Sequence, residues 1–242
     1  MQKNVEKMTI NYSPNFDLKK RHKNKIKYLI FHYTGMKNDK LAIKKLTSFN
    51  SNVSCHYYIT SSGNLIQMVP DLYTAWHAGK SNWRNDKSLN HNSIGIEISN
   101  PGHEHGYRKF NDKQIKTLIK ISKTLIKKYK INKKNILGHS DVAPERKKDP
   151  GEKFPWQLLF NKQIGIWHRL KESKLKKLKN KLITSSDTRL GLKLLKKIGY
   201  KFNNKSKVVK AFQRRFRQKL INGIIDKETL EIIKNLVHIY RF

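Results

Sequence analysis

The sequence predicts an α/β fold, with a mixed central β-sheet flanked by helices, followed by a small C-terminal three-helix domain. Through the first two thirds of the chain, apolar segments of strand length alternate with segments of helical periodicity, as in α/β layer folds. The last 55 or so residues carry helical patterns only. A length of 242 residues fits one medium-sized domain and one small domain.

The strands are predicted from short apolar runs that end at turn residues. Ser61-Ser62-Gly63-Asn64 separates two such runs and predicts a hairpin. In Ser93–Ser99, alternation places Gly95, Glu97 and Ser99 on one face of a buried strand. The predicted strands, in chain order, are residues 27–35, 56–60, 65–69, 93–99 and 136–137.

Helices are predicted where apolar residues recur at helical spacing. The strongest pattern is the amphipathic stripe of residues 111–130, and weaker ones cover residues 39–49 and 156–160. Between Asp71 and Asn92 the chain is predicted to form a long aromatic and polar loop, a kind of segment that is usually functional. The residues after Leu137 are predicted to form a shaped loop rather than a helix, because Pro144, Pro150 and Gly151 follow.

The C-terminal part begins with a lysine-rich segment, residues 168–184, predicted as a basic amphipathic helix or a linker. Ser186-Asp187 could cap the next helix, which Gly199 would end. Two more helices are predicted over residues 207–219 and 226–237. The expected domains are an N-terminal arm, a catalytic domain, a lysine-rich linker and a three-helix domain, over residues 1–25, 26–168, 169–184 and 185–242.

The composition is strongly basic, with a formal net charge of +36 from 53 Lys and Arg against 17 Asp and Glu. Only 10 of these cations are Arg, the residue that reads phosphates and base edges, and the lysines are spread along the whole chain. We therefore interpret the charge as a property of the solvated surface and expect no specific nucleic acid, with attraction to an anionic polymer as the alternative. The single cysteine, Cys55, excludes an internal disulfide and a cysteine-rich zinc site.

Localisation is predicted from the absence of a recognisable membrane span or signal peptide in the sequence. No apolar run approaches the ~20 residues of a membrane span, and the first ten residues lack the apolar core of a signal peptide. The expectation is a cytoplasmic monomer. The alternative is the periplasm or cell envelope, if the N-terminus is incomplete or export is non-standard.

Three residues at strand ends and in a loop could bind a metal. His32 and His139 follow apolar strands, and Asp149 comes ten residues after the second histidine. Two imidazoles and a carboxylate are the ligand set of catalytic zinc sites, which keep the fourth tetrahedral position open. We therefore predict Zn²⁺ as cofactor, with His32, His139 and Asp149 as ligands.

Glu97 and Lys147 are the candidate catalytic pair. Glu97 lies inside a strand that is predicted to be buried, and an unpaired buried carboxylate is costly. Either a structural lysine or arginine neutralises it, or it is a general base with a raised pKa. Lys147 could stabilise an oxyanion, and the alternative is one more surface lysine.

Five motifs, spread in order over residues 26–168, resemble one known family. They are Phe31-His32-Tyr33-Thr34, Ser54-Cys55-His56-Tyr57, Ala75-Trp76-His77-Ala78-Gly79, Asn92-Ser93-Ile94-Gly95-Ile96-Glu97 and Gly138-His139-Ser140-Asp141 through Arg146-Lys147-Lys148-Asp149-Pro150-Gly151. They are similar to those of the zinc-dependent N-acetylmuramoyl-L-alanine amidases of the type 2 amidase family. That family also contains phage T7 lysozyme-like amidases and peptidoglycan recognition proteins.

The resemblance implies hydrolysis of the amide between N-acetylmuramic acid, or its 1,6-anhydro form, and L-alanine in peptidoglycan or muropeptides. It places zinc on His32, His139 and Asp149 and catalysis on Glu97 and Lys147, and none of these five positions departs from the family pattern. The alternative is a peptidoglycan-recognition protein without catalysis. In such proteins a zinc ligand is typically replaced.

The resemblance also implies substrate contacts and a role for the C-terminal domain. Trp76, His77 and Arg146 border the groove in which the family binds its substrate, whereas Trp76 could instead be a core residue. His56 is expected to support the site rather than to bind metal. The helix of residues 209–216 and the turn and capped helix of residues 223–230 resemble the peptidoglycan-binding three-helix domain, with a plain helical appendage as the alternative.

Overall fold

The structure, a computed structural model, describes residues 8–242, so part of the predicted N-terminal arm lies outside the described residues. By their packing, the residues form two compact units. The first comprises the chain up to Gly79 together with Ser88–Leu137, and the second comprises Lys80–Lys87 with Gly138–Phe242. Within the described range, no helix is both long and apolar enough to cross a membrane.

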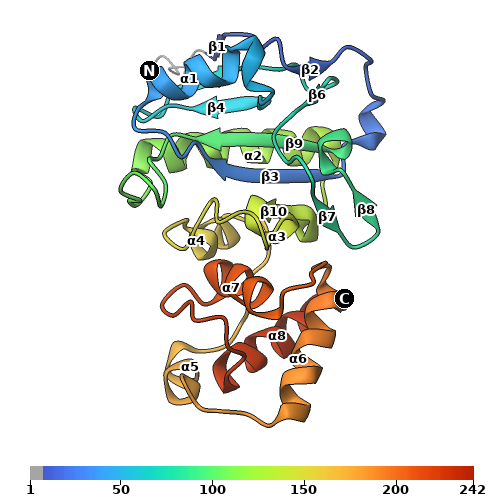
Figure 1. Cartoon of the computed structure of the whole chain (residues 1–242), viewed down its shortest axis with the longest axis vertical. Helices are drawn as coiled ribbons and strands as arrows, with labels where there is room; N and C mark the ends of the chain where they lie inside the picture. The colour runs from blue at the N-terminus through green and yellow to red at the C-terminus, as the bar shows by residue number, and fades with distance from the viewer. Residues whose placement is uncertain (1–7) are drawn as a thin grey trace, which may run out of the picture. The chain divides into compact units, whose positions relative to one another are not determined.

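A six-stranded mixed sheet is the centre of the α/β fold, as predicted (Figure 1). The strand order is β1-β5-β4-β9-β3-β10. Strands β4, β9 and β3 run parallel to one another, β4 and β5 form the predicted antiparallel hairpin, and β1 adds in parallel to β5. The strands of this sheet are β1 (Thr9–Ile10), β3 (Tyr28–Tyr33), β4 (Tyr57–Ile59), β5 (Leu65–Gln67), β9 (Ser93–Ile98) and β10 (Ile136–Gly138).

Two helices cover opposite faces of the sheet. Neighbouring residues of a strand point to opposite faces, so Tyr57 and Tyr58 of β4 face different helices. On one face, Tyr58 packs in a core with residues of α1 (Asp39–Thr47). On the other, the Tyr57 hydroxyl donates to Asp71, which also accepts from Tyr129 at the end of α2 (Asp112–Tyr129).

The predicted helix of residues 111–130 is confirmed as α2. It begins with a capping box, in which the Asn111 side chain accepts from the Gln114 amide and the Gln114 side chain accepts from the Asn111 amide. It ends at Lys130, whose φ of 51° is left-handed.

The predicted long loop of residues 71–92 contains short strands that the sequence pattern did not indicate. Strand β6 (Thr74–Ala75) pairs with β2 (Phe16–Asp17) of the N-terminal arm, and β7 (Asn82–Trp83) pairs with β8 (Asp86–Lys87). Two-residue strands are too short to show a period, so only pairing defines them.

The loop predicted after Leu137 was wrong in its first residues, because a single helical turn, α3 (His139–Val142), follows β10 directly. The Asp141 side chain accepts the Gly138 amide at 2.8 Å, which caps this turn. Pro144 lies beyond the turn and therefore does not prevent it. The next helix, α4 (Trp156–Asn161), is where the sequence predicted one.

The second unit also contains the C-terminal helices. The lysine-rich segment forms α5 (Glu172–Leu178), and the three predicted helices are α6 (Ser185–Ile198), α7 (Lys205–Phe216) and α8 (Lys227–Tyr240). The cap of α6 is Thr184, which accepts the Asp187 amide, rather than the predicted Ser186-Asp187. Buried apolar residues such as Leu195, Phe212 and Ile233 form the core.

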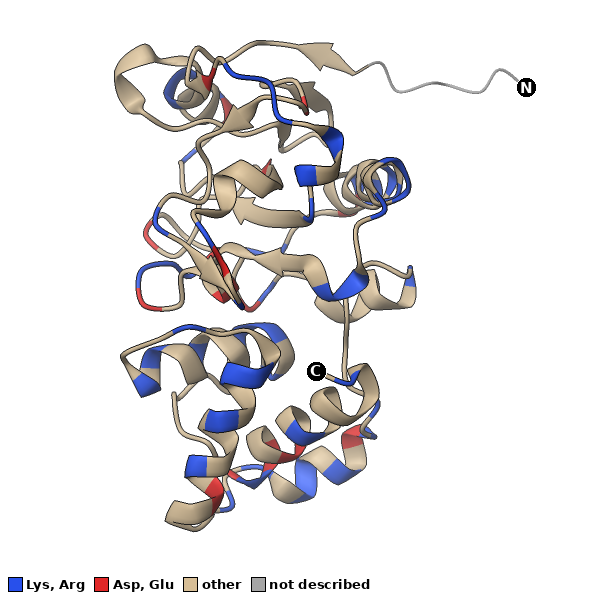
Figure 2. Cartoon of the chain, turned by 90° about the vertical axis from the view of Figure 1, so that its right-hand side faces the viewer, with Lys and Arg blue, Asp and Glu red and all other residues tan. Residues whose placement is uncertain are grey.

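Lysine and arginine residues occur on elements of both units rather than on a single element (Figure 2). This distribution agrees with the interpretation of the charge as a property of the whole surface.

A buried carboxylate, Asp71, joins the loop after β5 to the end of α2. Its side chain accepts from the hydroxyls of Tyr57 and Tyr129, both at 2.6 Å, and from Lys128 Nζ at 2.7 Å. Burial alone would raise the pKa of Asp71, but the hydrogen bonds from Lys128, Tyr129 and Tyr57 hold it below its usual value of 3.8.

We expect Asp71→Asn to lower the free energy of unfolding by about 2–3 kcal/mol at pH 7, because hydrogen bonds to a charged acceptor are lost. Urea denaturation measures this change, with exposed Asp112→Asn as the control. The folded pKa of Asp71 is depressed, so its contribution is present above the ordinary carboxyl pKa and is lost as the pH falls through the folded value. The difference from wild type should therefore shrink in acid, and a constant difference would contradict this explanation.

Candidate metal and catalytic site

The first predicted ligand, His32, lies on the buried strand β3, where it is 1% exposed. The parallel register pairs His32 with Glu97 of β9, so the two side chains lie beside each other on the same face of the sheet. Glu97 is half-buried. The predicted acid and the first predicted ligand are thus neighbours.

The other two predicted ligands are carried by the segment that follows β10. His139 opens α3, and Asp149 returns to it: the Ser140 amide donates to the Asp149 carbonyl at 2.8 Å. His139 Nδ1 lies 3.0 Å from Asp149 Oδ2. Both side chains are buried.

His32, His139 and Asp149 form a group that fits a metal ion. Each offers one ligand atom, and these atoms all lie within 4.8 Å of one another. Two imidazoles and a carboxylate are the ligand set of catalytic zinc sites, in which bonds to nitrogen and oxygen are about 2.0–2.2 Å.

His77 orients His32. His77 Nε2 lies 3.1 Å from Ser93 Oγ, and the Ser93 hydroxyl donates its own proton to the Leu89 carbonyl. Ser93 Oγ must therefore accept the hydrogen bond from His77, so the proton of the His77 ring is on Nε2. His77 Nδ1 therefore carries a lone pair and accepts from His32 Nε2, 3.0 Å away. This arrangement leaves His32 Nδ1 as the nitrogen with a lone pair, which is the form that a metal requires.

Gly95 makes room for the ring of His77. A Cβ atom at position 95 would lie 2.3 Å from His77 Cγ, a distance too short for any residue other than glycine. Gly95 precedes Glu97 by two residues on the same face of β9, in agreement with the predicted alternation.

His56 packs next to His77 and is not among the three described residues that could hold a metal ion. The Gly95 amide donates to His56 Nδ1 at 3.0 Å, and His56 Nε2 lies 3.1 Å from the Tyr73 carbonyl. Burial and the nearby Arg21 guanidinium lower the pKa of His56 to about 3, so this imidazole stays neutral.

The remaining predicted residues lie in varied surroundings. Lys147 is half-buried and follows α3, and Arg146 is exposed and donates to the Lys80 carbonyl at 3.0 Å. Trp76 is half-buried, and its Nε1 donates to Asp17 at 2.8 Å. Catalysis by Lys147 and substrate contacts by Trp76, His77 and Arg146 stay predictions.

Sequence reasoning missed two residues that shape the site. Ser93, which fixes the tautomer of His77, was treated only as part of a strand. Asp141, which caps the turn carrying His139, was quoted only within a motif. Its spacing from Gly138, three residues as in a capping box, was the available signal.

Comparison with known proteins identifies relatives over most of the chain. Residues 22–152 match the family model described as N-acetylmuramoyl-L-alanine amidase. N-acetylmuramoyl-L-alanine amidase AmiD of Escherichia coli is 35% identical over 234 residues, which covers 89% of this chain and 84% of the relative. The 1,6-anhydro-N-acetylmuramyl-L-alanine amidase AmpD of Salmonella typhimurium is 38% identical over 104 residues, 43% of this chain and 54% of the relative.

Solved structures extend the similarity to the fold. The complex of E. coli AmiD with anhydro-N-acetylmuramic acid-L-Ala-D-gamma-Glu-L-Lys aligns with a TM-score of 0.78 and covers 89% of this chain and 90% of that one. AmpDh3 of Pseudomonas aeruginosa in complex with anhydromuramic pentapeptide is 26% identical, with a TM-score of 0.78, and covers 99% and 98%.

We expect Gly95→Ala to lower the free energy of unfolding by about 1–3 kcal/mol, because the new methyl group must displace the ring of His77. Chemical denaturation measures the loss. The matched control is Gly95→Ala in a His77→Ala background, where the ring is absent and the loss should be much smaller. Equal losses in the two backgrounds would show that the contact with His77 is not the cause.

Proposed function

The chain belongs to the type 2 family of N-acetylmuramoyl-L-alanine amidases, and we propose that it hydrolyses the amide between N-acetylmuramic acid and L-alanine with His32, His139 and Asp149 holding zinc. The observation that carries the proposal is the grouping of these three buried side chains, with ligand atoms within 4.8 Å of one another. The relatives solved in complex with anhydromuramyl peptides support muropeptides as the substrate class.

The metal site supplies Lewis acidity: when bound, zinc polarises a carbonyl and lowers the pKa of water at its open position. The protein's part is to present neutral imidazoles and an ionised carboxylate. For His32, His77 supports the neutral form by accepting a hydrogen bond from His32 Nε2–H, which leaves Nδ1 with a lone pair. The hydrogen bond between the Ser140 amide and the Asp149 carbonyl holds the loop that carries the carboxylate.

Glu97 is the proposed proton carrier. Its place beside His32 in the strand register supports this role. The carboxylate takes a proton from the attacking water as the oxygen bonds to the lactyl carbonyl carbon, and it returns the proton to the L-alanine nitrogen as the C–N bond breaks. Lys147 is proposed to stabilise the negative charge that develops on the carbonyl oxygen. The products are a lactyl carboxylate and a free amine.

We expect Glu97→Gln to keep metal binding and to lower kcat by roughly 10²–10⁴-fold, because a proton-transfer group is lost while the ligands stay. His139→Ala should instead lose the metal. Elemental analysis and hydrolysis of an anhydro-muropeptide measure the two properties, with exposed Glu104→Gln as the control. Full activity of Glu97→Gln would remove Glu97 from the reaction, and metal retained by His139→Ala would remove that ligand.

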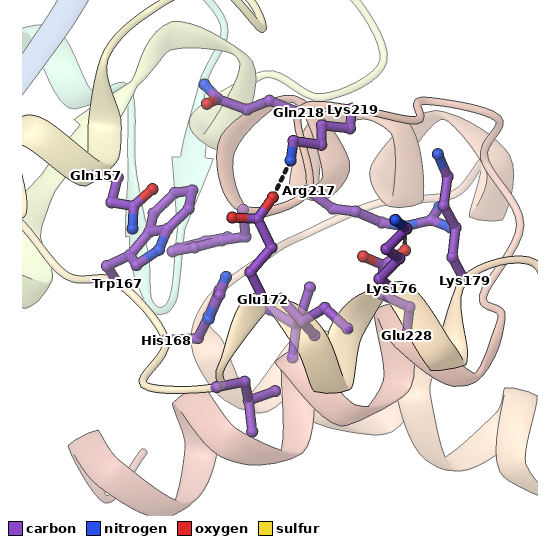
Figure 3. Close-up of a pocket in the computed structure, with 14 residues that line it drawn as sticks. Gln157, Trp167, His168, Glu172, Lys176, Lys179, Arg217, Gln218, Lys219 and Glu228 are labelled. Atoms are coloured by element: carbon purple, nitrogen blue, oxygen red, sulfur yellow. Dashed lines mark hydrogen bonds and ion pairs between the residues drawn. The ribbon is translucent and has the colours of Figure 1, made fainter.

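For the C-terminal helices we propose binding to peptidoglycan. A cavity of about 350 Å³, which is of ligand-binding size, lies among α5, α7, α8 and the segment before α5 (Figure 3). Trp167 and Phe216, with ring centroids 5.7 Å apart, give it an aromatic side. Lys176 of α5 and Lys179, directly after α5, also line it. Aromatic rings suit sugar faces, and the lysines suit the carboxylates of peptide stems.

We expect the double variant Lys176→Glu/Lys179→Glu to bind purified sacculi several-fold more weakly, because the reversed charges repel stem-peptide carboxylates. Co-sedimentation in the Glu97→Gln background, in which the sacculi stay intact, measures the bound fraction. Lys193→Glu/Lys197→Glu, which makes the same change of charge on the exposed surface of α6, is the control. Equal losses in both double variants would indicate general charge attraction instead of this cavity.

The cytoplasmic location and the monomeric state stay predictions.

A further inference from the structure

We propose that the C-terminal helices take part in building the metal site, and that Tyr200 and Arg215 are positioning residues for the segment that carries His139 and Asp149. The inference rests on the proposed function of these two residues as metal ligands. The link is Asp141, a buried carboxylate on the same helical turn as His139.

Asp141 is 1% exposed, and donors surround its carboxylate. The Tyr200 hydroxyl donates to Oδ1 at 2.6 Å, and Arg215 donates to Oδ2 at 2.6 Å. Oδ2 also accepts the amide of Gly138, at 2.8 Å. Two of the three donors therefore come from the C-terminal part, 59 and 74 residues further along the chain.

These bonds act on His139 through the backbone. The carboxylate that Tyr200 and Arg215 hold accepts the amide immediately before His139, so it sets the start of the turn from which the imidazole projects. The amide of the next residue, Ser140, then bonds the Asp149 carbonyl. A rotation of Asp141 would therefore disturb the backbone on which both proposed ligands depend.

Gly138 has little freedom to accommodate such a movement. A Cβ at this position would lie 2.6 Å from Pro150 Cδ and 3.3 Å from a ring carbon of Trp156. The guanidinium of Arg215 stacks over that same indole, with its carbon 4.3 Å from the ring centroid. Arg215 thus contacts both Asp141 and the aromatic ring that packs on Gly138.

The two donors are themselves buried against aromatic rings. Arg215 is 2% exposed and also lies over the ring of Phe216 at 4.8 Å. Tyr200 is fully buried, with its ring edge-on to Trp83 at 4.9 Å. Burial and the nearby carboxylate of Asp141 raise the pKa of Tyr200 well above its usual value, so its hydroxyl stays a donor.

A second contact ties the same segment to the start of α7. Glu145 accepts the backbone amides of Asn203 and Asn204, both at 2.6 Å, and Asn204 is the N-cap of α7. The division of the chain into two compact units supports the same link. Residues from Gly138 onward belong to one unit with the C-terminal helices and not to the unit that contains β3 and β9.

The test compares two variants that each remove one buried hydroxyl from the same unit. Tyr200→Phe removes the donor to Asp141, and Tyr240→Phe removes a hydroxyl that bonds the backbone of Trp167. In the full chain, competition with a chromogenic chelator measures zinc affinity, and hydrogen exchange of the metal-free protein measures opening of the peptide that covers residues 138–150.

For Tyr200→Phe we expect zinc affinity to fall by roughly tenfold, the lower end of the effect of removing a group bonded to a metal ligand, because Tyr200 acts on His139 only through Asp141 and the backbone. Amide exchange of residues 138–150 should become faster. Tyr240→Phe should leave both unchanged, even if its melting temperature falls. Arg215→Lys keeps the charge but loses the planar guanidinium and its stacking on Trp156, so it should resemble Tyr200→Phe. Arg217→Lys is the matched control, because the partners of Arg217 are Asp226 and Glu228, and it should leave zinc affinity and exchange unchanged.

Wild-type affinity and wild-type exchange in both Tyr200→Phe and Arg215→Lys would overturn the proposal. Equal effects in Tyr200→Phe and Tyr240→Phe would overturn it as well, because they would indicate a general loss of stability. If the wild-type protein bound no zinc, the proposed function would fail. The exchange measurements on the metal-free protein would still decide whether Tyr200 and Arg215 position the segment.

Discussion

The register between β3 and β9 is the constraint on which the first half of the site depends. It pairs His32 with Glu97 and Ile30 with Gly95. A shift by one residue would turn every side chain of one strand to the opposite face and separate the acid from the histidine. The same register places the bare backbone of Gly95 where the ring of His77 must lie. One set of backbone hydrogen bonds therefore determines the neighbours of His32.

The buried imidazoles beside His32 pack closely together. His77 stacks edge-on against both His32 and His56, with ring centroids 5.0 and 5.6 Å apart. Burial and the nearby Arg21 lower the pKa of His56 to about 3, so that imidazole is neutral. The hydrogen bond between His32 Nε2 and His77 Nδ1 leaves His32 Nδ1 as the nitrogen that could bind a metal.

Much of the sheet and of the candidate site could be predicted from the sequence because local patterns define them. The apolar runs of β3 and β9 and the stripe of α2 are long enough to show a period. The motifs around His32, His139 and Asp149 indicated three residues whose ligand atoms lie within 4.8 Å of one another. Short features were not predictable in this way. The turn α3 has four residues, too few for a period, and its capping carboxylate comes from within the turn. The hydrogen bonds from Tyr200 and Arg215 to Asp141 join residues 59 and 74 positions apart, and no local sequence pattern predicts them.

The link between the C-terminal helices and Asp141 is a buried ion pair with Arg215, and a buried ion pair differs from an apolar contact in its effect on position. Apolar contacts tolerate small sliding movements, so the core of the C-terminal helices alone would stabilise the second unit without fixing Asp141. A buried ion pair behaves differently, since Arg215 and Asp141 are nearly inaccessible and any displacement leaves a charge without its partner. Replacing a whole buried ion pair by apolar residues is often neutral for stability, whereas removing one partner is strongly destabilising because the other charge stays buried and unpaired. The Arg215–Asp141 pair is therefore better explained as a device that sets the position of the turn carrying His139 than as a source of stability.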